Sequence, residues 1–127
     1  MGRGTYKVVS GIEDWPYKGK RVVVLSESLK NVRNDAELYN GNVVNLIEKL
    51  HKEGTKHIYV DGGVSISQFI SADLIDQIII SIVPVILGKG ISLYKNIFNE
   101  SWYQLLSTQS YSNGLVQLKY QRANGSK

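Results

Sequence analysis

The stretch His57-Ile-Tyr-Val-Asp-Gly-Gly-Val-Ser-Ile-Ser-Gln-Phe-Ile70 decides the fold class. Its first four residues form an apolar run that predicts a strand, and Ile66, Phe69 and Ile70 recur at the spacing of the buried face of a helix. The connection between the two is Asp61-Gly-Gly63. A strand that leads directly into a helix is typical of an α/β fold, in which helices cover a sheet.

The alternation of strand and helix patterns extends along the whole chain. Continuous apolar runs predict strands covered on both faces, apolar residues three and four apart predict helices, and alternation around Asn-Gly predicts a hairpin. We therefore expect one α/β domain over residues 1–122, built on a mostly parallel sheet flanked by helices with a C-terminal antiparallel hairpin, and a disordered tail over 123–127. The expected elements are a helix from Gly2 to Gly11, strands over 22–25 and 36–39, a helix from Asn42 to Gly54, a strand over 76–87 that bulges or ends at Pro84, and a hairpin of 102–110 with 115–121 around Ser112-Asn-Gly114.

Composition excludes several classes of protein. The chain has 127 residues, of which 43% are apolar and 20% charged, as in an ordinary globular domain. It has no cysteine and only two histidines, His51 and His57, which excludes a disulfide scaffold, a thiolate site and a multi-histidine metal centre. No apolar run approaches the ~20 residues of a membrane helix, and the first residues lack the apolar region of a signal peptide. We expect a cytoplasmic protein with no metal and no membrane partner.

The distribution of charge favours an anionic partner. The net charge is +4, and seven of the fifteen basic residues fall within the first 33 positions, against three acids. A phosphorylated small molecule or a nucleic acid would suit this pattern, and a mildly basic solvated surface would produce it too. A nucleic-acid partner rests on charge alone, because no groove-reading motif is present. We expect a small-molecule ligand and no nucleic acid.

Four short segments could contact a phosphorylated ligand. Gly2-Arg-Gly-Thr5 begins a predicted helix and offers free N–H groups, a guanidinium and a hydroxyl, although it could also be a disordered terminus. Ser26-Glu-Ser28 follows a strand, where ligands gather in open α/β sheets, although its serines could simply cap a turn. Asp61-Gly-Gly-Val-Ser65 allows backbone to approach a ligand at a helix N-terminus, or is a plain connector. Gly88-Lys-Gly90 is better explained as a turn.

Four segments follow one another in an order that resembles a known family: Met1-Gly-Arg-Gly-Thr-Tyr6, Val22-Val-Val-Leu-Ser26, Ile58-Tyr-Val-Asp-Gly-Gly63, and Leu74-Ile-Asp76 with Pro84-Val-Ile-Leu-Gly-Lys-Gly90. They are similar to the bacterial dihydrofolate reductase-like proteins, most of all to the reductase domain of the bifunctional riboflavin-biosynthesis deaminase/reductase. Each segment is weakly specific alone, but the ordered set is specific and covers nearly the whole chain. The resemblance implies a three-layer dihydrofolate reductase-like fold.

The resemblance also implies a function. It points to an NADPH-dependent reductase that transfers a hydride to a pteridine or ribosylaminopyrimidine substrate. The cofactor residues that it implies are Gly2, Arg3 and Thr5 at the phosphates, Leu25, Ser26 and Ser28 on the adenosine side, and Gly62, Gly63, Val64, Ser65 and Ile66 around the pyrophosphate; Asp61 is the implied substrate contact.

Two departures from the family pattern affect these expectations. Glu27 stands where the family often carries an arginine, and a carboxylate there would repel a 2′-phosphate. The sequence also begins inside the Gly-Arg motif, whereas the family has a strand and a helix before it, so the chain resembles an amino-terminally truncated member. Such a chain would expose apolar surface, and we expect a homodimer or larger oligomer. The alternative function is a non-catalytic remnant that binds a dinucleotide or only assembles.

Overall fold

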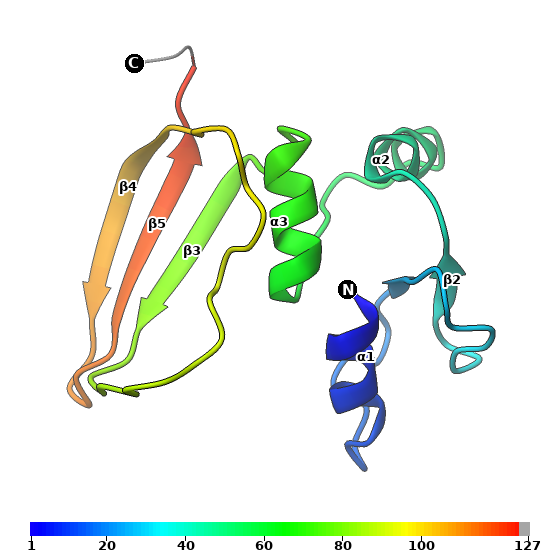
Figure 1. The fold of residues 1–127 in the computed structure, drawn as a ribbon, viewed down its shortest axis with the longest axis horizontal. Helices are drawn as coiled ribbons and strands as arrows, with labels where there is room; N and C mark the ends of the chain where they lie inside the picture. The colour runs from blue at the N-terminus through cyan, green and yellow to red at the C-terminus, as the bar shows by residue number, and fades with distance from the viewer. Residues whose placement is uncertain (125–127) are drawn as a thin grey trace.

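The computed structural model describes residues 1–124, and its helices and strands are labelled in Figure 1. The strands pair into two separate sheets: β1 and β2 are parallel, whereas β3, β5 and β4 form an antiparallel sheet with β5 in the middle. In chain order the elements are α1 (Arg3–Ser10), β1 (Val23–Leu25), β2 (Glu37–Tyr39), α2 (Val43–Lys52), α3 (Gly63–Ser71), β3 (Gln77–Ile82), β4 (Tyr103–Ser110) and β5 (Val116–Arg122).

The mixed α/β class is confirmed, but the expectation of one mostly parallel sheet is wrong. Parallel pairing within residues 1–124 is confined to β1 with β2 and a single bridge between Gly2 and Leu25. The apolar run 57–60, a predicted strand, forms none, because no described segment offers it a backbone partner. A strand exists only through its hydrogen bonds to a neighbour, so apolar sequence alone does not produce one. The two sheets therefore remain separate.

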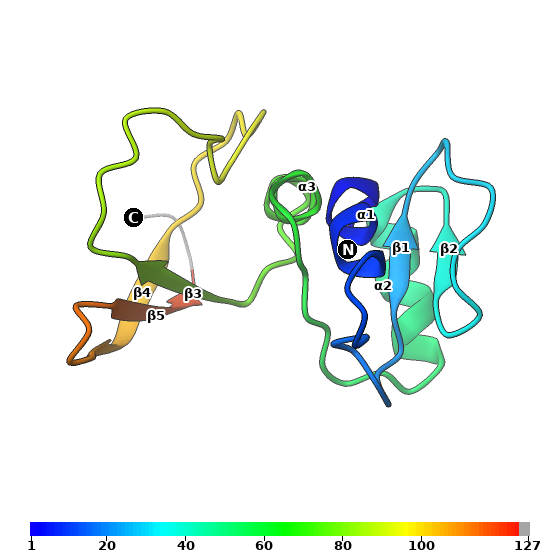
Figure 2. The ribbon, with the colours of Figure 1, turned by 90° about the horizontal axis from the view of Figure 1, so that it is seen from below.

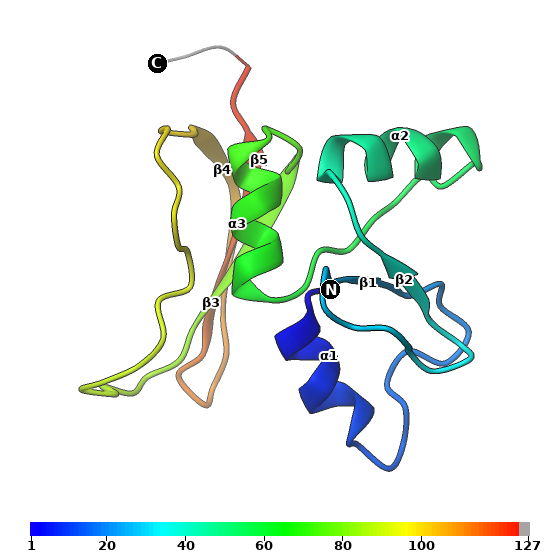
Figure 3. The same cartoon turned by 45° about the vertical axis from the view of Figure 1, so that its right-hand side comes forward.

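Strand β1 is covered on both faces, as its continuous apolar sequence predicts. On one face Val24, which is fully buried, packs in a cluster with Tyr6 of α1. On the other face Val23 packs against a cluster that contains Leu50 of α2 and Phe69 of α3. Figure 3 shows α1 and α2 on opposite sides of the β1–β2 pair. Burial of each such side chain contributes about 1.5–3 kcal/mol, which fixes both helices on this small sheet.

The predicted helix from Asn42 to Gly54 is confirmed as α2. The Asn42 side chain accepts a hydrogen bond from the Val44 N–H at 2.7 Å and so caps the helix N-terminus. Gly54 adopts a φ of +87°, and its N–H donates to the His51 carbonyl at 2.9 Å. This left-handed residue ends the helix, as glycine commonly does.

The end of β3 and the C-terminal hairpin also match their predictions. Strand β3 ends at Ile82, two residues before Pro84, which has no N–H to donate to a ladder. In the hairpin turn the Asn113 side chain accepts a hydrogen bond from the Leu115 N–H at 3.1 Å, and Gly114 has a φ of +89°. The Asn-Gly pair thus supplies both the local hydrogen bond and the positive φ that the turn requires.

The long segment 83–101 returns from β3 to β4 and passes beside α3 (Figure 1). Ser67 of α3 binds this segment through a hydrogen bond. The Ser67 hydroxyl donates to the Gly63 carbonyl at 2.7 Å and accepts from the Lys95 N–H at 3.0 Å. Figure 2 shows α3 between the two sheets, with the N-terminus of the chain beside it. Helix α3 therefore holds the beginning of α1 on one side and the 83–101 segment on the other.

The expected disordered tail begins with a residue that is held in place. The Ala123 N–H donates to the Trp102 carbonyl at 3.0 Å, which extends the β4–β5 pairing by one contact. Residues 125–127 of the expected tail lie outside the described residues.

Candidate functional site

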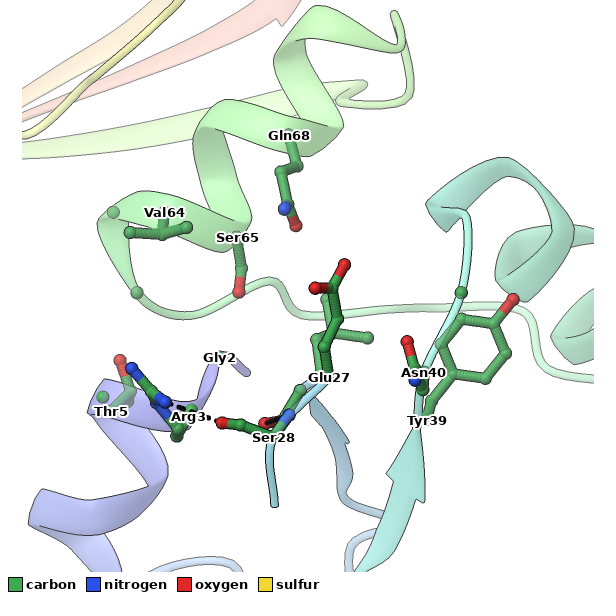
Figure 4. A pocket seen from close by; sticks show the side chains of 16 residues that line it. Gly2, Arg3, Thr5, Glu27, Ser28, Tyr39, Asn40, Val64, Ser65 and Gln68 are labelled. Carbon is green, nitrogen blue, oxygen red and sulfur yellow. Dashed lines mark hydrogen bonds between the residues drawn. The ribbon is translucent and has the colours of Figure 1, made fainter. Parts of the chain in front are cut away.

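A cavity of about 580 Å³ lies where the N-termini of α1 and α3 meet the carboxyl ends of β1 and β2 (Figure 4). Three of the segments that the sequence singled out contribute to it, although the first and the last of them, 2–5 and 61–65, lie far apart in the chain. The volume falls in the ordinary range of small-molecule and cofactor sites. The carboxyl ends of parallel strands are also where ligands of α/β proteins bind.

The two helices that face the cavity have uncapped N-termini. Gly2 and Gly62 are the N-cap residues of α1 and α3, and neither provides a side chain to bind the first N–H groups. Helical hydrogen bonding begins at the N–H groups of Tyr6 and Ile66, so those of residues 3–5 and 63–65 have no intrahelical acceptor. The N-terminus of α2, which follows the lining residue Gly41, is by contrast capped by the Asn42 side chain. Both N-termini therefore bring N–H groups without an intrahelical acceptor, and positive partial charge, to the same cavity.

Arg3 adds a full positive charge to this arrangement. It occupies the first turn of α1, where a cation is opposed by the helix dipole, and no acidic residue occurs in the first turn of either helix. Its guanidinium donates to the Ser28 hydroxyl at 2.6 Å, as the dashed line in Figure 4 marks. The helix dipole opposes an arginine at this position, and an anion bound beside the guanidinium would offset that cost.

The glycines of the site bring backbone and side chains into close approach. Gly62 has a φ of +94°, and a methyl group there would overlap the Thr5 hydroxyl. A Cβ at Gly2 would lie 2.9 Å from the Ser65 Oγ, so α1 and α3 begin in direct contact. Gly63 serves a different purpose, because its missing Cβ would lie 2.9 Å from the Leu93 carbonyl of the 83–101 segment. Only the first two glycines therefore shape the contact between the two helix N-termini.

The two serines after β1 differ in the hydrogen bonds that their hydroxyls already form within the protein. The Ser26 hydroxyl accepts hydrogen bonds from the N–H groups of Ser28 and Leu29, at 3.2 and 3.0 Å. Ser26 therefore caps the turn, which is the alternative that the sequence offers for this segment. Ser28 is exposed, and its hydroxyl, with Arg3, faces the cavity. Of the two, Ser28 is better placed to contact a ligand.

Most of the predicted cofactor residues share this one cavity. Ile66 does not line it, and neither does Asp61, the predicted substrate contact. Six lining residues are absent from the implied cofactor residues, although Gly4 and Glu27 lie within the candidate segments 2–5 and 26–28. The rule that ligands gather at strand ends would have identified the three that follow or end β2. The predicted residues on the wall are Gly2, Arg3, Thr5, Leu25, Ser26, Ser28, Gly62, Gly63, Val64 and Ser65, and the additional ones are Gly4, Glu27, Tyr39, Asn40, Gly41 and Gln68.

Asp61 precedes Gly62 and lies just outside the cavity wall. Its carboxylate accepts a hydrogen bond from the Tyr17 hydroxyl at 2.9 Å. Tyr17 in turn packs edge-on against buried Trp15, with ring centroids 5.2 Å apart. Burial and the hydrogen bond to the Asp61 carboxylate raise the pKa of Tyr17, which therefore remains a proton donor to Asp61 throughout the neutral range. The sequence gives no sign of this Tyr17–Asp61 pair, since 44 positions separate the two residues.

Several basic residues near the amino terminus are already paired with acids. Arg21 contacts both Glu37 and Glu53 at 2.7 Å, and the hydrogen bond from Arg21 lowers the pKa of Glu37. Lys18 pairs with Asp14 and Arg33 with Asp35. These ion pairs leave less positive charge for a long polyanion than the composition implies.

Residues 1–124 contain no group of three or more His, Cys, Asp or Glu side chains that could hold a metal ion. None of the described helices is long and apolar enough to cross a membrane.

Comparison with solved structures identifies similar folds. The chain is similar to the “Putative riboflavin biosynthesis protein” of Shewanella sp. PV-4, with a TM-score of 0.91, 32% identity, and coverage of 98% of this chain and 72% of that one. It shares its fold with a pyrimidine reductase-like protein of Corynebacterium diphtheriae, with a TM-score of 0.63, 19% identity, and coverage of 81% and 50%.

Comparison of sequences gives relatives and a family. The Bacillus subtilis protein YyaP is 33% identical over 80% of this chain, and YwjB of the same organism is 31% identical over 97%. The chain spans 54% of the length of YyaP and 72% of that of YwjB. Residues 11–117 match the family described as RibD C-terminal domain, which confirms the resemblance to a riboflavin-biosynthesis reductase domain. The chain therefore belongs to the RibD C-terminal domain family.

Proposed function

We propose that the chain binds a reduced nicotinamide adenine dinucleotide in the 580 Å³ cavity and belongs to an oxidoreductase that reduces a pteridine or ribosylaminopyrimidine. The observation that carries the proposal is the convergence of two uncapped helix N-termini and Arg3 on one cavity. This is the donor set that a pyrophosphate requires: several backbone N–H groups, two helix dipoles and a guanidinium. Membership of the RibD C-terminal domain family supports the reaction class.

In this proposal each part of the cavity binds a different part of the dinucleotide. The N–H groups of residues 63–65 and 3–5 bind the pyrophosphate, and Gly62 keeps both helix N-termini close enough to share it. The ends of β1 and β2, at Leu25–Ser28 and Tyr39–Gly41, hold the adenosine half. The bound dinucleotide would supply the hydride. The resemblance implies NADPH as the form used, and the donor set described here suits the scaffold that NADPH and NADH share.

Asp61 is assigned to the substrate side in this proposal. Asp61 precedes Gly62 in the chain and does not line the cavity. The Tyr17 hydroxyl fixes the Asp61 carboxylate by a hydrogen bond. A carboxylate in a fixed orientation can accept hydrogen bonds from the ring N–H or amino groups of a pteridine or pyrimidine. Such contacts position the acceptor atom at the ~3–3.5 Å from the hydride donor that the reaction requires. A reductase that draws on the general nicotinamide pool would operate in the cytoplasm.

The test is a titration of the chain with NADPH and NADH, followed by their fluorescence, and a separate assay of their oxidation. Saturable binding of either dinucleotide with a Kd in the micromolar-to-millimolar range supports the cofactor site. Oxidation in the presence of dihydrofolate or a ribosylaminopyrimidine phosphate supports the reaction. If the chain and its longer relatives bind the dinucleotide but none of them oxidises it, the non-catalytic alternative is favoured.

A further inference from the structure

The lining of the cavity contains two charged side chains of opposite sign, Arg3 and Glu27. Glu27 lies two residues after the end of β1 and is exposed to solvent. Figure 4 shows its side chain extending into the cavity, away from the hydrogen bond between Arg3 and Ser28. Among the described residues Glu27 forms no ion pair and no hydrogen bond through its carboxylate. Its charge is therefore uncompensated and available to a ligand.

An uncompensated carboxylate distinguishes NADH from NADPH by simple electrostatics. The two differ by one phosphate group on the adenosine ribose, which carries about −1.5 to −2 charges at neutral pH. With Arg3 and Glu27 together, the lining has no net charge to attract that additional phosphate. Repulsion between one carboxylate and one such phosphate about 6 Å apart in a water-rich cavity corresponds to roughly a 5- to 50-fold loss of affinity.

The same carboxylate suits a ribose without the phosphate. Free 2′- and 3′-hydroxyls are donors, and a carboxylate at a strand end is the group that accepts from them in many dinucleotide sites. Arg3 does not reverse this preference. Its guanidinium donates to the Ser28 hydroxyl at 2.6 Å, and the Glu27 side chain extends away from that hydrogen bond, so the guanidinium forms no ion pair with the carboxylate (Figure 4).

We propose that Glu27 makes the cavity favour a dinucleotide whose adenosine ribose carries free hydroxyls, so that NADH binds at least as tightly as NADPH. The inference rests on the proposed function, since it places the adenosine half at the end of β1. It assigns to Glu27 a role in specificity and departs from the NADPH dependence that the family resemblance implies.

The test compares NADH with NADPH, and 5′-AMP with adenosine 2′,5′-bisphosphate, on the same chain. Variants Glu27→Gln and Glu27→Arg remove and reverse the charge. Glu48→Gln is the matched control, because Glu48 is an exposed acid of α2 outside the cavity, and its loss changes the net charge equally. Glu27 is exposed, so both variants should retain the circular dichroism of the original chain.

The wild-type chain should bind NADH with a Kd equal to or up to about tenfold below that for NADPH. Glu27→Gln should strengthen NADPH binding about 5- to 20-fold while NADH changes less than threefold, Glu27→Arg should strengthen it further, and Glu48→Gln should change neither. Clear preference of the wild type for NADPH, or equal changes for both dinucleotides in Glu27→Gln, overturns the role of Glu27. Failure of both dinucleotides and both nucleotides to bind overturns the proposed function itself, and the inference with it.

Discussion

Gly62 lies directly against Thr5: with a φ of +94° and no side chain, it leaves the Thr5 hydroxyl where a methyl group on Gly62 would be. This contact joins the start of α3 to the start of α1. It is the reason that two short helices, separated by more than fifty residues, direct their free N–H groups into one cavity.

Substitution of Gly62 by alanine should therefore do two kinds of damage. The strained φ should cost about 1–3 kcal/mol of stability, and the overlap with Thr5 should separate the helix N-termini and weaken dinucleotide binding at least tenfold. Gly54→Ala is the matched control, because Gly54 has a φ of +87° but nothing within 4 Å of its Cβ position. Denaturant unfolding and fluorescence titration measure the two effects. Equal binding by Gly62→Ala and the wild type would show that the helix contact does not shape the site.

Arg3 should make binding of the dinucleotide dependent on salt. Arg3→Gln removes the guanidinium from the α1 N-terminus, and we expect affinity to fall about 5- to 30-fold at low ionic strength and much less at high ionic strength. Lys7→Gln removes an equal charge from the last turn of the same helix, outside the cavity, and should change affinity less than twofold. Titrations across a range of salt concentrations distinguish the two variants. Identical salt dependence for Arg3→Gln and the wild type would remove Arg3 from the phosphate site.

Asp61 should affect reduction without affecting dinucleotide binding. Asp61→Asn keeps the size of the side chain and can still accept from Tyr17, but removes the charge that would orient a substrate. In a longer relative with measurable turnover, the equivalent change should lower kcat/KM at least tenfold, while the Kd for the dinucleotide changes less than threefold. A parallel loss of dinucleotide affinity would instead move Asp61 into the cofactor site.

Exposed apolar surface should make the chain associate with itself. Its accessible surface is 9716 Å², whereas a compact monomer of 14.2 kDa exposes roughly 6,800 Å². The outer edge of β3 is unpaired within the described residues and carries no charged residue, and Ile79 is 62% exposed on it. Segment 83–101 adds Ile86 and Phe98, at 97% and 91%. Such an edge and such patches are normally covered by another chain.

Sedimentation at micromolar concentrations should therefore show a homodimer or larger species. Ile79→Lys should shift it toward the monomer, because a charge on this strand opposes pairing with a second copy. Val8→Lys, at a position of α1 that is 71% exposed, is the control and should leave association unchanged. A monomeric profile for the wild type contradicts the prediction.

The elements that the sequence predicts correctly are those stabilised by interactions between residues close together in the chain. Helix α2 and the C-terminal hairpin depend on near neighbours, such as Asn42 with Val44 and Asn113 with Leu115, and the sequence predicts both. The run 57–60 has the composition of a strand, but strand formation depends on a partner elsewhere in the chain, which apolar content does not reveal. The same long-range dependence explains why the parallel sheet ends at β1 and β2.

The residues of the candidate site likewise fall into two groups: those that local sequence patterns indicate and those that only the tertiary structure brings in. Glycines, serines and Arg3 at the ends of predicted elements indicate an anion site, and the structure brings them to one cavity. Tyr39 and Gly41 join it only because β2 lies parallel to β1, so that both carboxyl ends open on the same side. Tyr17 reaches Asp61 through the packing of Trp15, which no local pattern indicates. Residues of this kind require the tertiary structure.

If the two uncapped helix N-termini hold the pyrophosphate of a nicotinamide dinucleotide, a direct binding titration will detect it. Increasing amounts of the chain are added to NADH and to NADPH, and the change in nicotinamide fluorescence is followed at low and at high salt. We predict saturable binding with a Kd in the micromolar-to-millimolar range, roughly 4–8 kcal/mol, that weakens as salt rises and is at least tenfold weaker in Gly62→Ala. If neither dinucleotide binds at any salt concentration, the two helix N-termini do not form a pyrophosphate site.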